Sequence, residues 1–196
     1  MGCKMSFLEI FYEKYEPKLA KRSDTFRKIF LYLELLNGEQ FTIVETGTAR
    51  QPDNWQWDGQ STILWDAFVN HYSGVIYSID NDEKAIEVAR TSVSKSVHFI
   101  FGDSIQTLKN MDNKIIEQID LLYLDSYDFD PNNPIPSAFH HLEELAVIYR
   151  RLKKGCLIVV DDCFADDLGK HLLIYRFMNS LGISPLFRGY QYGWII

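Results

Sequence analysis

The chain has 196 residues, a size typical of one compact domain, and 27 acidic against 20 basic side chains give it a formal net charge of −7. This balance disfavours a nucleic-acid partner, because affinity for phosphate backbones depends on clustered Lys and Arg. The three cysteines match neither a zinc site nor a redox pair, and no apolar run approaches the ~20 residues of a membrane span. We therefore expect one cytoplasmic domain over residues 1–196 with no membrane span.

The N-terminal segment 1–40 is expected to form helices that precede the core at 41–196. Apolar residues recur at helical spacing across 7–36, and Asn37-Gly38 ends the pattern. The first six residues also match the N-myristoylation pattern at Gly2, with Cys3 beside it as a palmitoylation candidate, although so short a match often arises by chance.

Short apolar runs then alternate with helical patterns, which is typical of an α/β fold with a doubly wound, mostly parallel sheet and helices on both faces. The last two apolar runs are separated by three residues, so they must pair as an antiparallel hairpin and complete a seven-stranded sheet. The expected strands are 41–45, 75–80, 97–101, 119–125, 156–161, 185–188 and 192–196, and the expected core helices are 62–72, 83–93, 137–152 and 168–181.

Acidic residues follow five of these strands in succession. In an open parallel sheet the ligand lies outside the carboxyl ends of the strands, so these positions point to a site. Each acid taken singly is explained equally well as a helix cap or turn residue, but five together favour a function. The residues are Glu45, Asp80, Asp103, Asp125 and the pair Asp161-Asp162.

The turn after the first strand contains one glycine, Gly47, which lets the backbone approach a ligand closely. A pyrophosphate-binding loop has three glycines, so this turn disfavours NAD and FAD as cofactors. Asp80 ends the second strand, where an acidic side chain accepts hydrogen bonds from both ribose hydroxyls of an adenosine.

The successive motifs ETGT, SIDND, FGDS, LLYLDS and LIVVDD resemble those of class I S-adenosylmethionine-dependent methyltransferases, which have a Rossmann-like fold. The resemblance runs from about residue 41 to the end of the chain and depends on the order of the motifs. It implies that Glu45, Gly47 and Thr48 line the methionine part of the cofactor, that Asp80 holds the ribose, and that Asp103 and Ser104 contact the adenine. Ser61, Asn81 and Asp125 are the other residues expected at the cofactor.

Asp125, Asp161 and Asp162 end two strands that are neighbours in this topology, so their carboxylates are expected to converge. Three carboxylates without a basic partner repel one another unless a cation joins them, and hard oxygen ligands suit Mg²⁺. This set resembles the magnesium site of catechol and macrolide-sugar O-methyltransferases. The alternative is that Asp161-Asp162 only opens a loop.

The resemblance implies direct transfer of a methyl group to a hydroxyl of a small molecule, such as a sugar or natural product. The metal would lower the pKa of that hydroxyl, and Asp125, His140 or His141 would take its proton. A catechol-type enzyme carries a lysine where this chain has Asp128, which weakens a catechol assignment. The loop with Trp55 and Trp57 is expected either to close over the ligands or to remain a surface loop, and a homodimer could complete the acceptor pocket.

Two other functions compete with methyl transfer. The first is a non-catalytic binding module with the same fold. The second is a nucleotide-dependent sugar-modifying enzyme, such as an epimerase or reductase, which the missing phosphate-binding glycines and the missing Tyr-x-x-x-Lys pair disfavour.

Overall fold

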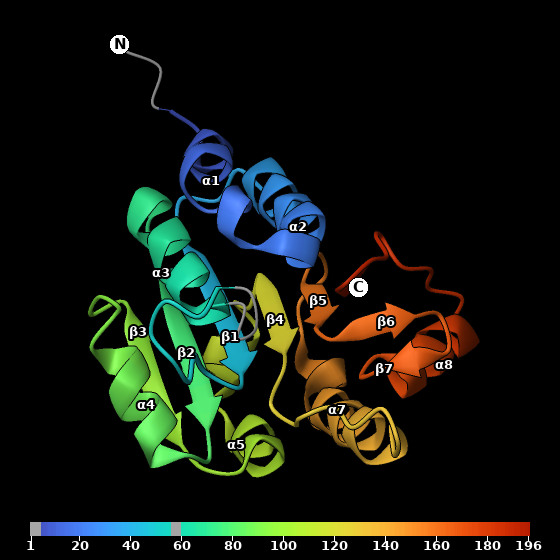
Figure 1. Ribbon diagram of the computed structural model, residues 1–196. Coiled ribbons are helices and arrows are strands. Elements are labelled where there is room, and N and C mark those ends of the chain that lie inside the picture. Colours follow the sequence, from blue (N-terminus) through green and yellow to red (C-terminus); the bar gives the residue numbers. More distant parts are fainter. Residues whose placement is uncertain (1–4, 56–59) are drawn as a thin grey trace.

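The structure is a computed structural model that describes residues 5–55 and 60–196. Its centre is a six-stranded sheet in the order β3-β2-β1-β4-β5-β8, in which β8 alone runs antiparallel to its neighbour β5 (Figure 1). The strands are β1 (Phe41–Thr46), β2 (Gly74–Asp80), β3 (Val97–Phe101), β4 (Leu121–Leu124), β5 (Leu157–Val160) and β8 (Tyr192–Ile195). This confirms the doubly wound, mostly parallel fold predicted from the sequence.

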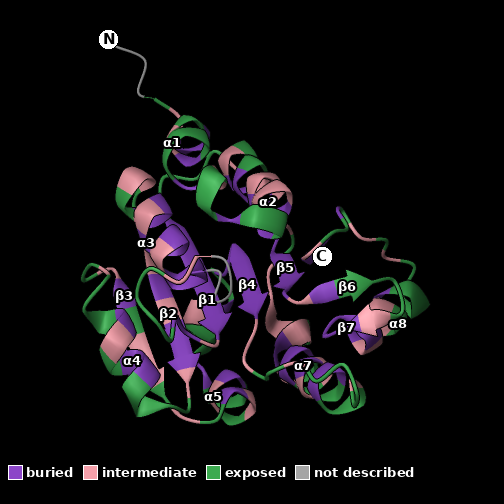
Figure 2. Cartoon of the chain, in the orientation of Figure 1, coloured by how far each residue is buried: buried purple, intermediate pink, exposed green. Residues whose placement is uncertain are grey.

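One face of the sheet is covered by the N-terminal helices and α3. Alternate strand residues such as Ile43 and Tyr123 point into this layer, where aromatic side chains including Phe30 and Trp65 are fully buried. Figure 2 shows the central strands β1, β4 and β5 in the colour of buried residues. The elements are α1 (Phe7–Lys14), the 3₁₀ turns η1 (Glu16–Lys18) and η2 (Ala20–Arg22), α2 (Ser23–Leu35) and α3 (Ser61–Tyr72). The N-terminal segment is therefore an integral layer of the core.

The other face is covered by the later helices, which pack on the remaining strand residues, such as Val44 and Ile158. The elements of this face are α5 (Ser104–Asn110), α6 (Asn113–Ile116), α7 (Ile135–Ile148), the 3₁₀ turn η3 (Tyr149–Arg151) and α8 (Leu172–Ser180). Helix α4 (Glu83–Arg90) lies beside β2 and β3 at the edge of the sheet, where Arg90 packs on Phe99 of the first face. Burial on both faces explains why the central strands read as continuous apolar runs.

The predicted count of seven strands is wrong for this sheet. The segment 185–188 makes only a single bridge, Phe187 to Gly193. Pro185 has no amide hydrogen to donate to a ladder, and the link that follows turns toward the interior, where Gln191 donates to the Tyr123 hydroxyl. The predicted hairpin is therefore reduced to one bridge beside β8.

The structure contains a small hairpin that the sequence did not predict, formed by β6 (Cys163–Ala165) and β7 (Leu168–Gly169). It occupies the start of the helix expected at 168–181, so that α8 begins only at Leu172. Within the described ranges, no helix has the length and apolar character needed to cross a membrane.

Candidate active site

A cleft lies at the carboxyl ends of the parallel strands, beside the point between β1 and β4 where the strand order reverses. Two adjoining cavities of about 220 and 50 Å³ form it and share Gly47, Asp80, Asn81 and Ser126. Eight of the nine residues predicted to bind the cofactor line these cavities, namely Gly47, Thr48, Ser61, Asp80, Asn81, Asp103, Ser104 and Asp125.

Glu45 is the predicted residue that does not line the cleft, because its side chain is fully buried behind the cavity wall. Its carboxylate accepts hydrogen bonds from the hydroxyls of Ser61 at 3.2 Å and Ser78 at 2.7 Å. Burial raises the pKa of Glu45 to about 7, although the neighbouring hydroxyls oppose the shift. Glu45 thus acts on the cleft through Ser61, which it holds at the cavity wall.

Gly47 is required by a close backbone contact. Its φ is +82°, and a Cβ atom at this position would lie 2.5 Å from the carbonyl oxygen of Asp125. Its amide donates to the Ile79 carbonyl at 2.9 Å. The turn after β1 is therefore clamped between the ends of β2 and β4, and this contact fixes the floor of the cleft.

The Asp80 carboxylate is held between two turns by backbone amides. One oxygen accepts from the Thr48 amide and the other from the Asp82 amide, both at 2.8 Å. The side chain lines both cavities. It is thus fixed in orientation at the junction of the cavities, as a group that recognises a ligand hydroxyl must be.

At the far end of the smaller cavity, Ser104 and His140 form a hydrogen bond of 3.1 Å beside Asp103. Next to His140, Glu144 is fully buried and accepts a hydrogen bond from Ser126 at 2.7 Å. Burial opposes its ionisation, but the hydrogen bonds from His140, Ser104 and Ser126 outweigh that effect and lower the pKa of Glu144 to about 2. An ionised carboxylate therefore supports this wall of the cleft.

The two histidines predicted as bases lie in different surroundings. His140 is at the Asp103 end of the cleft, whereas His141 is fully buried, with its Nδ1 bonded to the Ser137 carbonyl at 2.6 Å. Burial lowers the pKa of His141 to about 4, so its imidazole is neutral. The catalytic roles of both histidines stay predictions, and the burial of His141 gives an acceptor no access to it.

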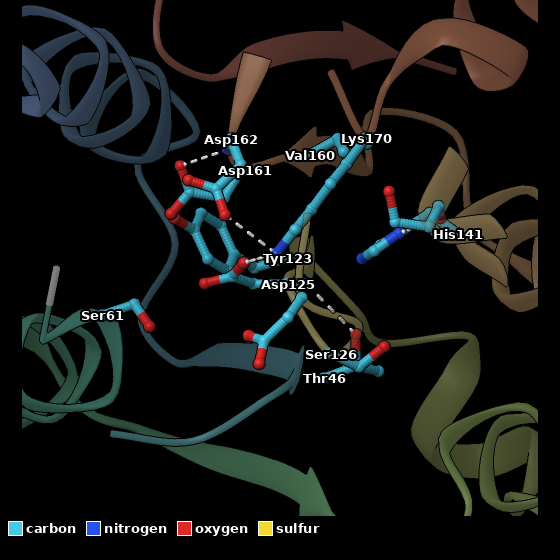
Figure 3. Close-up of polar contacts among 12 residues, drawn as sticks. Thr46, Ser61, Tyr123, Asp125, Ser126, His141, Val160, Asp161, Asp162 and Lys170 are labelled. Carbon is cyan, nitrogen blue, oxygen red and sulfur yellow. Dashed lines mark hydrogen bonds and ion pairs between the residues drawn. The ribbon is translucent and has the colours of Figure 1, made fainter. Parts of the chain in front are cut away.

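Asp125, Asp161 and Asp162 do converge at the ends of β4 and β5 (Figure 3). Asp161 accepts from the Tyr123 hydroxyl at 2.6 Å and from the Asp162 amide at 2.8 Å. Asp162 has a φ of +52° and accepts from the Tyr190 hydroxyl at 2.9 Å. Asp tolerates this left-handed conformation better than most residues, so the turn places both side chains of the pair at the site.

Two buried cations, which the sequence analysis did not identify, neutralise this cluster. The Lys170 ammonium lies 2.5 Å from Asp125 and 3.0 Å from Asp162, and Figure 3 shows its extended side chain reaching them. The Arg22 guanidinium lies 3.5 Å from both Asp161 and Asp162. The side chains of Lys170 and Arg22 are only 2% and 7% exposed, so these ion pairs are poorly screened by solvent.

Lys170 directly follows β7, so the β6–β7 hairpin positions it at the site. The Lys170 amide donates to the Asp162 carbonyl at 3.2 Å, and a Cβ on Gly169 would lie 2.7 Å from that same oxygen. Sequence reasoning assigned this segment to a helix and so gave Lys170 no role. The available signal was the motif Leu168-Gly169-Lys170, since a glycine there argues against a regular helix start.

The expected magnesium site assumed carboxylates without a basic partner, and that assumption is wrong. Five of the six carboxylate oxygens accept a hydrogen bond or ion pair, and only Asp125 Oδ2 has no such partner among the described residues. In residues 5–55 and 60–196 no three His, Cys, Asp or Glu side chains are arranged to hold a metal ion. The donor set as it stands does not fit a divalent cation, because the ammonium lies between two of the expected ligands.

Two other expectations fall partly outside the described residues. Trp57, of the expected lid loop, and Gly2 and Cys3, of the lipidation pattern, lie outside them. Trp55 is described: it packs against Tyr15, and its indole nitrogen donates to Asp53 at 2.6 Å. These contacts agree with a surface loop anchored by Trp55.

Solved structures of methyltransferases share this fold. The MycE methyltransferase from the mycinamycin biosynthetic pathway, in complex with Mg and SAH, matches with a TM-score of 0.68 and 14% identity over 98% of this chain and 54% of that one. The chain thus spans about half the length of MycE. CalS11, a TDP-rhamnose 3′-O-methyltransferase in calicheamicin biosynthesis, matches with a TM-score of 0.60 and 15% identity over 95% and 86% of the two chains.

No curated protein matches the sequence. A family model described as a methyltransferase domain matches residues 56–163, which is more than half of the chain and includes β2 to β5 with the acidic strand ends. With the cleft, the strand order and this match in agreement, the chain belongs to this methyltransferase family and has the fold of class I S-adenosylmethionine-dependent enzymes.

Proposed function

We propose that the protein transfers a methyl group from S-adenosylmethionine to a hydroxyl of a small molecule bound at the cleft. The observation that carries this proposal is the continuous cleft, whose junction holds Asp80 and whose wall reaches Asp125. The cofactor would lie along both cavities, so that its methyl group faces the end of β4.

The cleft offers a suitable group to each part of the cofactor. Asp80 would accept hydrogen bonds from the ribose hydroxyls beside Asn81, because both of its oxygens are already oriented by backbone amides. Thr48 and Ser61 line the larger cavity, where the methionine part would lie, and Asp103 with Ser104 would contact the adenine in the smaller one.

The transfer itself needs one acceptor for a proton. As the acceptor oxygen forms its bond to the methyl carbon, the carbon–sulfur bond breaks and S-adenosylhomocysteine leaves, while the hydroxyl proton must move to a base. Asp125 is the candidate base, because it lines the cleft and its Oδ2 has no partner among the described side chains. No step in this scheme uses a metal ion.

The proposed acceptor is a sugar-linked or natural-product hydroxyl. The net charge of −7 suits a small neutral or cationic molecule better than a nucleic acid. A further cavity of about 320 Å³ is lined in part by Phe164, Tyr190 and Tyr192, and the Tyr190 hydroxyl donates a hydrogen bond to Asp162. Its aromatic faces could pack against the apolar face of a sugar ring.

Calorimetry with S-adenosylmethionine tests the cofactor site. We expect wild type to bind one equivalent and Asp80→Ala to weaken binding about 30-fold or more, since two hydrogen bonds to a charged group contribute about 2 kcal/mol or more. The matched control is Asp130→Ala, because Asp130 also accepts from the amide two residues ahead at 2.8 Å but lies outside the cleft. Unchanged affinity in Asp80→Ala would contradict the ribose role.

A second measurement separates the enzyme from a non-catalytic binding module. Sugar-linked hydroxyl compounds would be incubated with protein and cofactor, and release of S-adenosylhomocysteine would be followed. Acceptor-dependent release supports methyl transfer. Cofactor binding without release across sugars, glycosylated natural products and their aglycones would favour the binding module.

A further inference from the structure

We propose that Lys170 is a built-in cation that takes the place of a divalent metal ion between Asp125 and Asp162, so that this site works without a bound metal. This inference deepens the proposed function and rests on it. It makes Lys170 a positioning residue, because its buried ammonium acts on the acceptor through Asp125.

The position of the ammonium carries the first step. Lys170 Nζ lies 2.5 Å from Asp125 Oδ1 and 3.0 Å from Asp162 Oδ2, so it bridges the ends of β4 and β5. A magnesium ion would bind carboxylate oxygens at about 2.0–2.1 Å and needs an octahedral set of ligands. Such an ion could not share this space with the ammonium, and Lys170 would have to be displaced first.

The charges of the cluster carry the second step. Three carboxylates face two buried cations, Arg22 and Lys170, which leaves a formal charge of −1. Repulsion among the carboxylates was the reason to expect a metal, and these cations already relieve it. Burial alone would lower the pKa of Lys170, but Asp125 and Asp162 outweigh it and raise that pKa above its ordinary value, so the ammonium remains charged.

The third argument is the local fold, because the backbone around Lys170 holds this residue beside Asp162. Gly169 has a φ of +144° and lies so close to the Asp162 carbonyl and Cys163 that any side chain there would clash. The Lys170 amide then bonds to the same Asp162 carbonyl. The hairpin therefore fixes the backbone of Lys170 beside the carboxylates.

The geometry also indicates what the ammonium does for the reaction. It occupies Asp125 Oδ1 and so fixes that carboxylate with Oδ2 as the oxygen left to an acceptor hydroxyl. A metal in the same place would bind the acceptor directly, whereas Lys170 orients the carboxylate that does so.

The test is a gain of metal binding, measured with Mn²⁺ as the probe in the full chain with S-adenosylhomocysteine present. By calorimetry and by the loss of the free Mn²⁺ signal in electron paramagnetic resonance, we expect no stoichiometric binding to wild type. We expect Lys170→Ala to bind about one Mn²⁺ per chain, because its carboxylates lose a counter-charge and gain space. The double variant Lys170→Ala with Asp162→Asn should lose that binding again.

Lys170→Met is the matched control, since it removes the charge but keeps the space filled, and we expect it to bind Mn²⁺ at least tenfold more weakly than Lys170→Ala. Thermal unfolding gives a second readout: 1 mM Mn²⁺ should raise the melting temperature of Lys170→Ala and leave that of wild type unchanged. If Lys170→Ala fails to fold without metal but folds with Mn²⁺, the proposal is supported.

A Mn²⁺ titration of the wild-type protein is by itself sufficient to overturn the proposal. Binding of one Mn²⁺ per wild-type chain that Asp162→Asn abolishes would show that the metal displaces Lys170, and a Lys170→Ala variant that folds without gaining Mn²⁺ affinity would contradict it as well. If Lys170→Ala folds under neither condition, wild-type binding decides the question. These outcomes are separate from cofactor affinity, so failure of Asp80→Ala to weaken binding would refute the proposed function without deciding the role of Lys170.

Discussion

The two ends of the cleft hold their carboxylates in different ways. At the ends of β1 and β2, Glu45 and Asp80 are held by hydroxyls and backbone amides, whereas Asp125, Asp161 and Asp162 at β4 and β5 are paired with buried Lys170 and Arg22. We call the first group, with its neutral donors, the neutral end, and the second, with its buried cations, the charged end. In the proposed function Asp80 of the neutral end binds the ribose hydroxyls, whereas the cations of the charged end hold Asp125 in a fixed position.

The largest expected effect comes from breaking the charged end. Arg22→Met leaves the buried Asp161 without its ion-pair partner, while Asp162 keeps Lys170, and we expect it to lower the free energy of unfolding by about 4 kcal/mol. Urea unfolding measures this. The double variant Arg22→Met with Asp161→Asn should recover about half of the loss, and Asp161→Asn alone serves as the reference. Strictly additive effects of the two changes would mean that the pair is not energetically coupled.

A somewhat smaller effect is expected where the two ends meet, at Gly47. Gly47→Ala would press a Cβ against the Asp125 carbonyl at 2.5 Å in a left-handed conformation, which should cost about 3 kcal/mol of unfolding free energy. The matched control is Gly182→Ala, whose φ is +74° but whose Cβ would meet no atom within 4 Å, so it should cost only about 1 kcal/mol. Equal losses in the two variants would show that the Asp125 contact contributes nothing.

The smallest expected effect concerns Glu45 at the neutral end, whose contribution to the free energy of unfolding depends on pH. Because the pKa of Glu45 rises from 4.5 to about 7 on folding, the folded chain holds its proton over a range in which the unfolded chain has lost it. The contribution of Glu45 to stability therefore falls as the pH increases from about 4.5 to 7. Glu45→Gln removes this dependence, so the free energy of unfolding of the variant relative to wild type should increase by about 2 kcal/mol between pH 5 and pH 8.

Chemical unfolding at several pH values checks this slope. Glu87→Gln, on the exposed side of α4, is the control for loss of one negative charge. A difference between Glu45→Gln and wild type that stays constant from pH 5 to pH 8 would contradict the assignment of a buried, proton-holding carboxyl to this position.

The sequence by itself determined the strand and helix alternation, because buried strands and amphipathic helices are encoded by local periodicity. It also placed Asp80, Asp125 and Asp161 at strand ends, and the rule that ligands lie beyond the carboxyl ends of parallel strands brought them to one edge. Errors began where periodicity stopped, as in 185–188, where a single bridge replaced an expected strand.

The tertiary structure alone decided how the charges are matched. Arg22 lies 140 residues from Asp162 and Lys170 lies 45 residues from Asp125, and neither belongs to a local pattern that marks it as their partner. It likewise decided that Glu45 lies behind the cavity wall while its neighbour Gly47 lines it. Ion pairing and burial depend on which distant segments pack together, whereas strand position depends on near neighbours in the chain, and this is why the sequence located the site but not its counter-charges.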